Sequence, residues 1–171
     1  MNDEESQTMN FVARMVILGI DPGSEQSAWC RYDCERHVVT GHAKATNTQL
    51  LDMLPGAIEL ADMLAIEYMR PRGMPTSAEE MDTQFTAGRL VECWLQAGMQ
   101  PQSWTRIYRS DVKKTLCGSM RAKDSNIRQA IIDLFPKTGG GKVPQIGTKS
   151  SPGPLYGITR DCWSALAIAI T

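Results

Sequence analysis

Short apolar runs and longer helical repeats follow one another along this chain. Helical spacing of apolar residues occurs over residues 50–54, 76–97, 110–118, 124–134 and 159–170. Strand-like runs occupy residues 14–20, 27–33, 37–42, 61–67 and 105–108. We expect the first helix to stop before Pro55, because proline disrupts a helix interior. Three strands, then helices that alternate with two more strands, predict an α/β domain with a mixed five-stranded sheet flanked by helices.

The start of the chain differs in composition from the rest. Residues 1–13 are polar and acidic, which predicts a disordered tail ahead of one domain over residues 14–171. No apolar run approaches the roughly 20 residues that span a bilayer, so we expect no membrane association. Five cysteines, an odd number without an export signal before them, favour free thiols and a location in a reducing cytoplasm.

The charge is distributed unevenly, although the net charge at pH 7 is only −1. Residues 1–105 hold seven Lys or Arg against fifteen Asp or Glu, whereas residues 106–160 hold eleven against three. A basic segment of this kind is typical of a surface that binds a polyanion. The alternative is that the two halves interleave in space and neutralise each other.

Three acidic residues lie directly beside apolar runs that should be buried. Asp21 follows the first strand, Glu67 ends the fourth strand, and Asp161 begins the last helix. Because an unpaired buried carboxylate is costly, we expect these acids to gather around a hard cation such as Mg²⁺. Carboxylates at strand ends that hold Mg²⁺ are typical of phosphodiester hydrolysis.

The motifs around these acids resemble those of the RuvC-type Holliday junction resolvases of the RNase H-like superfamily, in the small versions that bacteriophages encode. The resemblance spans about residues 15–171 and implies an RNase H-like sheet and nuclease domain. Its motifs occur in one order and are Ile20-Asp21-Pro22-Gly23-Ser24, Ala65-Ile66-Glu67, Val112-Lys113-Lys114, Ala122-Lys123-Asp124 and the run from Asp161 to Ala169.

The resemblance implies that Asp21, Glu67 and Asp161 ligate Mg²⁺, or Mn²⁺ in its place. The family closes with two acids one helical turn apart, and here Ser164 stands where the second acid would be. Positions i and i+3 share a helix face, so we expect Ser164 to point at the same site as a weaker, neutral metal ligand. The resemblance also places Lys113 and Lys123 near the metals, where an ammonium neutralises charge on the transition state.

Basic and aromatic residues supply the candidate nucleic-acid contacts. Tyr68, Arg70 and Arg72 follow the second acid, in the place of the family's wedge-like loop at the junction centre. An aromatic side chain there can stack on a base while arginines hold phosphates. The glycine run within residues 137–157 resembles a nucleotide-binding P-loop but lacks its spacing. We instead expect residues 137–157 to form a flexible basic flap over the nucleic-acid backbone. The other candidate contacts are Lys113, Lys114, Arg121, Lys123, Lys142 and Lys149.

We therefore expect a homodimeric, Mg²⁺-dependent endonuclease that resolves Holliday junctions or other branched DNA by paired nicks with 5′-phosphate ends. The 76–97 helix has more than one apolar face, as a helix that also packs on a partner subunit would. One alternative is a junction-binding protein whose catalysis is weakened by Ser164. Another is an actin-like ATPase, whose first strand also ends in an Asp-x-Gly turn, although such folds need two domains and a longer chain.

Overall fold

The computed structural model describes residues 15–70, 73 and 75–171, so the expected tail and Arg72 lie outside the described residues. Its centre is a five-stranded sheet of β1 (Val16–Asp21), β2 (Gln26–Asp33), β3 (Val38–Thr46), β4 (Met63–Glu67) and β5 (Trp104–Ile107). The strand order is β3-β2-β1-β4-β5. Strands β1, β2 and β3 are antiparallel, whereas β1, β4 and β5 are parallel. The predicted mixed sheet is confirmed.

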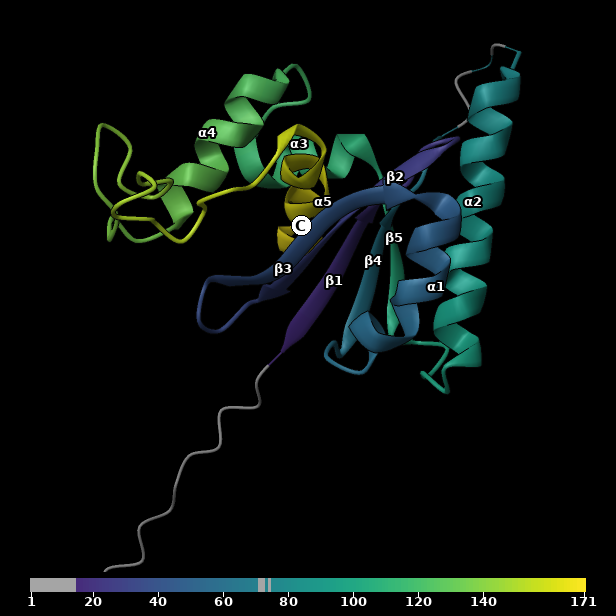
Figure 1. Ribbon diagram of the computed structural model, residues 1–171. Coiled ribbons are helices and arrows are strands. Elements are labelled where there is room, and N and C mark those ends of the chain that lie inside the picture. The colour runs from purple at the N-terminus through teal and green to yellow at the C-terminus, as the bar shows by residue number, and fades with distance from the viewer. Residues whose placement is uncertain (1–14, 71–72, 74) are drawn as a thin grey trace, which may run out of the picture.

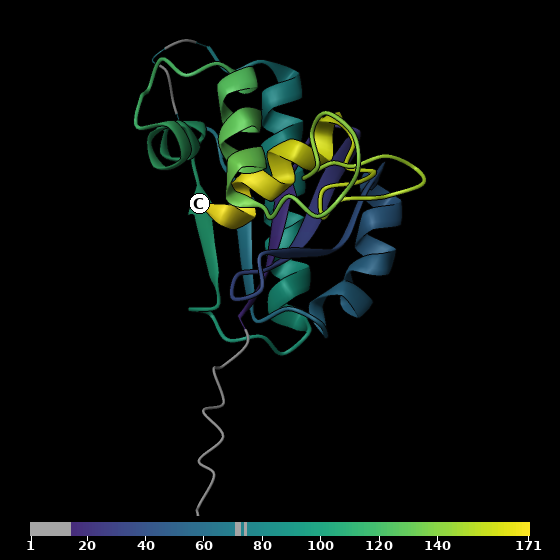
Figure 2. The same ribbon diagram turned by 90° about the vertical axis from the view of Figure 1, so that its left-hand side faces the viewer.

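Helices cover both faces of this sheet (Figure 1). One face carries α1 (Asn47–Ile58) and α2 (Ala78–Gln96), and the other carries α5 (Arg160–Ile170) with α3 (Arg109–Cys117) and α4 (Asp124–Leu134) beside it. Figure 2 shows α5 crossing in front of the strands, with α4 next to it. No helix in the described part of the chain is long and apolar enough to cross a membrane.

The two charged halves of the sequence occupy different parts of the fold. The basic segment 106–160 supplies α3, α4 and the loop before α5, all on the α5 side of the sheet (Figure 1). The acidic first half supplies four of the strands together with α1 and α2. Most of the basic segment therefore lies on the α5 side of the sheet (Figure 1).

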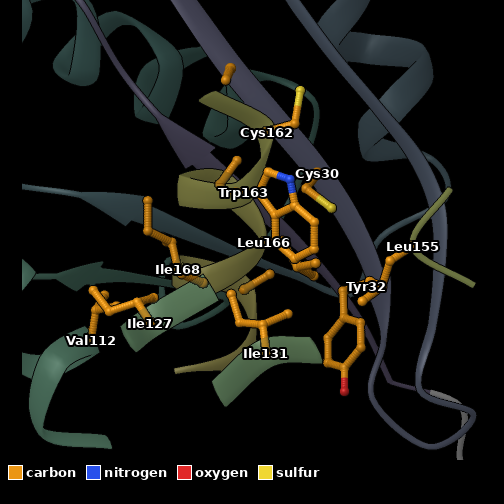
Figure 3. Close-up of a cluster of buried hydrophobic side chains, with 14 of the residues drawn as sticks. Cys30, Tyr32, Val112, Ile127, Ile131, Leu155, Cys162, Trp163, Leu166 and Ile168 are labelled. Atoms are coloured by element: carbon orange, nitrogen blue, oxygen red, sulfur yellow. The ribbon is translucent and has the colours of Figure 1, made fainter. Parts of the chain in front are cut away.

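Alternation along β1 divides the core into two layers. Leu18 and Ile20 pack against α1 and α2, whereas Gly19 faces α5. A Cβ added at Gly19 would lie 2.2 Å from the Ala165 carbonyl oxygen and 2.8 Å from the Ala169 Cβ. The glycine therefore lets the α5 backbone lie against the sheet. Figure 3 shows the apolar cluster on this side, where α5 meets the sheet, α4 and Leu155 of the loop.

Helix α1 continues through Pro55, so the expected stop before this proline is wrong. Proline removes one intrahelical hydrogen bond, but its own carbonyl still accepts from the Glu59 N–H at 3.2 Å. Leu54 before the proline and Ile58 after it are both buried against the sheet. Packing of the apolar face thus outweighs the local cost of the proline.

The loop over residues 137–157 is folded, so the expected flexible flap is also wrong. The Gly139 N–H donates to the Pro144 carbonyl at 2.8 Å, and the Gly153 N–H donates to the Ile146 carbonyl at 3.0 Å. Leu155 is fully buried in the α5-side core. These contacts hold the loop to itself and to the domain.

Candidate active site

The parallel strands β1, β4 and β5 end at the same edge of the sheet, and the candidate site lies there. Asp21 ends β1, Glu67 ends β4, and Arg109 follows β5 by two residues. Their neighbours Ile20 and Ile66 face the α1 and α2 layer, so alternation turns both acids towards α5. The two acids line a cleft of about 1260 Å³.

Asp21 and Glu67 form a coupled carboxylate pair. Burial, followed by the negative charge of Glu67 and a hydrogen bond with its side chain, raises the pKa of Asp21 to about 8. Arg109 acts in the opposite direction, and Asp161 adds a smaller upward effect. Two carboxylates forced together at a partly buried strand edge are a donor set that suits a hard divalent cation, which would replace the shared proton.

The turn after Asp21 is held by Asn47, the first residue of α1. The Asn47 side-chain amide donates to the Gly23 carbonyl at 3.0 Å and the Ser24 carbonyl at 2.9 Å. It also donates to the Thr86 hydroxyl of α2 at 3.2 Å, and its oxygen accepts from the Ser27 hydroxyl at 2.7 Å. Asn47 thereby fixes the backbone that presents Asp21.

Asp161, in the first turn of α5, pairs with a lysine. Its Oδ2 lies 2.7 Å from the Lys44 Nζ of β3, and the two side chains are each a little under half exposed. Asp161 and Ser164 together line a neighbouring cavity of about 600 Å³, and Arg109 lines both this cavity and the main cleft. Among the described residues, no three His, Cys, Asp or Glu side chains are grouped as a metal site.

The structure therefore brings Asp21 and Glu67 together and holds Asp161 apart, with Lys44. The donor set of Asp21 and Glu67 fits one divalent ion. The role expected for Asp161 and Ser164 as further metal ligands stays a prediction, with both residues on one face of α5 beside the cleft.

The predicted basic and aromatic contacts occupy two regions. Arg70 and Lys113 line the main cleft. Tyr68 is half-buried, 6.4 Å from the Tyr108 ring, and the Arg70 guanidinium lies 4.1 Å from the Tyr108 centroid. Lys123 is exposed at the start of α4 and lines neither cavity. The other candidates are exposed on the α3, α4 and loop side, and they are Lys114, Arg121, Lys142 and Lys149.

Sequence reasoning missed Lys44 and Arg109, although both are close to the acids. Arg109 is in an ion pair with Asp124 of α4 and lowers the pKa of Asp21. Its signal was present, because a basic residue directly after the last parallel strand lies at the same edge as the acids. Lys44 carried no such signal, since the expected third strand ended at His42.

No protein-family model and no curated protein matches the chain. Several solved structures match it, and they include two of RuvC that match over almost the whole length of the chain. Thermus thermophilus RuvC in complex with Holliday junction substrate has a TM-score of 0.65 and 16% identity, and the match covers 91% of each chain. A further structure of Thermus thermophilus RuvC has a TM-score of 0.61 and 16% identity, over 91% of this chain and 92% of the other. This chain has the RNase H-like fold of RuvC.

Proposed function

We propose that this chain is a metal-dependent endonuclease that cuts branched DNA, with four-way junctions as its main substrate. The observation that carries the proposal is the Asp21–Glu67 pair at the carboxyl edge of two parallel strands, facing a cleft. The likeness in fold to a RuvC structure that contains Holliday junction substrate supports the choice of DNA. The basic segment on the α5 side supports a nucleic-acid partner.

Asp21 and Glu67 would hold the divalent ion, Mg²⁺ or Mn²⁺. When bound, such an ion lowers the pKa of a water molecule and stabilises the leaving oxygen of the phosphodiester. Arg70 and Lys113 line the same cleft and would neutralise the phosphates on either side of the cut. Exposed lysines of α3 and of the folded loop would contact the DNA backbone farther away.

The proposed functional unit is a homodimer that pairs through α2. Met81 and Phe85 of this helix are 62% and 69% exposed. Beside Phe85 is a mostly apolar groove of about 620 Å³. Gln84 lines the groove, and its buried side-chain amide has no hydrogen-bond partner among the described residues. A second copy would cover the apolar side chains, and a twofold axis would present two active sites to opposing strands.

The test is cleavage of end-labelled duplex, fork, flap and four-way DNA with Mg²⁺ or Mn²⁺. We expect paired nicks with 5′-phosphate ends on the four-way substrate and none in EDTA. Junction binding without metal-dependent nicks would instead support the alternative of a binding protein, which the pairing of Asp161 with Lys44 and the neutral Ser164 favour. Equal cleavage of every substrate would contradict the proposed structure selectivity.

A further inference from the structure

Lys44 lies in a row of side chains that crosses the sheet to the acidic pair. In the register, Asp21 of β1 is opposite Ala28 of β2, and Ala28 is opposite Lys44 of β3. Ala43 and Ala45 pack towards the α1 and α2 layer, so alternation turns Lys44 to the α5 face, where Asp21 also points. Two strand spacings of about 4.8 Å separate the Lys44 and Asp21 backbones.

The middle position of this row leaves room for the lysine. Ala28 is only 2% exposed, and its methyl group is the only side chain between Lys44 and Asp21 in this register. The Lys44 chain reaches the Asp161 carboxylate, with 2.7 Å between Nζ and Oδ2. Lys44 also lines the cleft that contains Asp21 and Glu67. Its ammonium therefore lies within the candidate active site.

The pair does not act as a stabilising contact for the fold. Ion pairs between side chains as exposed as these contribute little to stability, because water screens both charges. Its effect is on the charge of the site. Ser164, one helical turn after Asp161, is neutral, so Asp161 is the single acid on its helix face and one ammonium balances it.

We infer that Lys44 takes the place of a second divalent ion at Asp161, so that the site holds one ion, on Asp21 and Glu67. This inference rests on the proposed function and specifies the composition of its site. The Lys44 ammonium would donate to a phosphate oxygen of the substrate, where a second metal would otherwise bind it. Ser164 brings no negative charge to this face of α5 and Lys44 brings a positive charge to it, so both reduce the need for a second divalent ion.

The experiment counts bound Mn²⁺ by electron paramagnetic resonance of the free ion, supported by isothermal titration calorimetry, in the full-length protein. We expect one ion per chain in the wild type and in Lys44→Arg, which keeps the cation. Lys44→Met frees Asp161, and we expect it to bind a second ion. Lys113→Met is the matched control, because it removes a positive charge from the same cleft without freeing Asp161, and we expect it to bind one ion.

A second pair of variants keeps the test decisive if Lys44→Met does not fold, which circular dichroism would show. Asp161→Asn should retain its single ion within about threefold of the wild-type affinity, whereas Glu67→Gln should weaken that ion by at least about tenfold. The inference is overturned by two ions, or none, in the wild type. It is equally overturned by one ion in folded Lys44→Met, or by loss of the ion in Asp161→Asn.

Junction cleavage by the same preparations separates the two claims. A wild-type protein that binds one ion and nicks no DNA would remove the proposed nuclease function and leave the role of Lys44 intact. A protein that nicks four-way DNA and binds two ions would remove the role of Lys44 and leave the nuclease function intact.

Discussion

Replacing Asp21 by asparagine should stabilise the metal-free protein at alkaline pH. The pKa of Asp21 is raised from an ordinary value of 3.8 to about 8, chiefly by burial and by Glu67. Between these two values the folded protein keeps a proton that the unfolded chain has released. The wild type therefore loses stability as pH rises from about 4 to about 8, and the loss is complete above that range. Asp21→Asn has no such proton to lose.

The size of the effect follows from the shift. Each pKa unit corresponds to about 1.4 kcal/mol, so the full shift from 3.8 to about 8 is worth about 6 kcal/mol. Asp21 is only partly buried at the edge of an open cleft, and local solvation reduces this value. We expect the free energy of unfolding of the wild type to fall by roughly 2–5 kcal/mol more than that of Asp21→Asn between pH 5 and pH 9.

Urea unfolding in EDTA at pH 5, 7 and 9 measures this difference. Asp52→Asn is the control, because it changes an exposed carboxylate on α1 and should follow the wild-type curve. The same Asp21→Asn protein should bind four-way DNA but no longer cut it, since a proposed metal ligand is lost while the basic side is unchanged. Parallel pH curves for Asp21→Asn and wild type would refute the reasoning about the carboxylate pair, and near-normal cleavage would refute the metal assignment.

Three further predictions test the DNA surface, the packing of α5 and the dimer. Junction affinity should fall steeply with salt, with a log–log slope of about −4 or steeper if the basic side contacts at least four or five phosphates, and a nearly flat fluorescence-anisotropy titration would contradict this. Gly19→Ala should cost about 1–3 kcal/mol by thermal unfolding and reduce cleavage, whereas Gly56→Ala, which has open space, should not; equal stability of the two would contradict the close contact. Phe85→Glu should shift sedimentation towards monomer, whereas Leu134→Glu, an exposed apolar residue on α4, should not, and an unchanged dimer would exclude α2 as the interface.

The acid pair could be predicted from sequence because its geometry depends on local patterns. Asp21 and Glu67 each end an apolar run, and parallel strands bring such ends to one edge without further information. The start of the helix predicted over residues 76–97 is also local, because Ser77 caps α2 through a capping box with Glu80.

The rest of the site depends on contacts between distant parts of the chain. Lys44 meets Asp161 only because β3 extends to Thr46, four residues beyond the strand that the sequence predicts. The small side chains at the end of β3 gave no clear strand pattern, and their partner lies near the end of the chain. Pro55 shows the same limit, since burial of α1 outweighed a local rule.

The Asn47 side-chain amide connects α2, the proposed dimer helix, to the turn that follows Asp21. A single planar group touches the turn behind Asp21 on one side and Thr86 in the middle of α2 on the other. Any tilt or slide of α2, such as one imposed by a partner subunit on its outer face, must therefore stretch these bonds or move that turn. The position of the Asp21 carboxylate is in this way made sensitive to the position of α2. An Asn47→Ala protein would lose these hydrogen bonds, so that a movement of α2 would no longer be passed to the turn after Asp21.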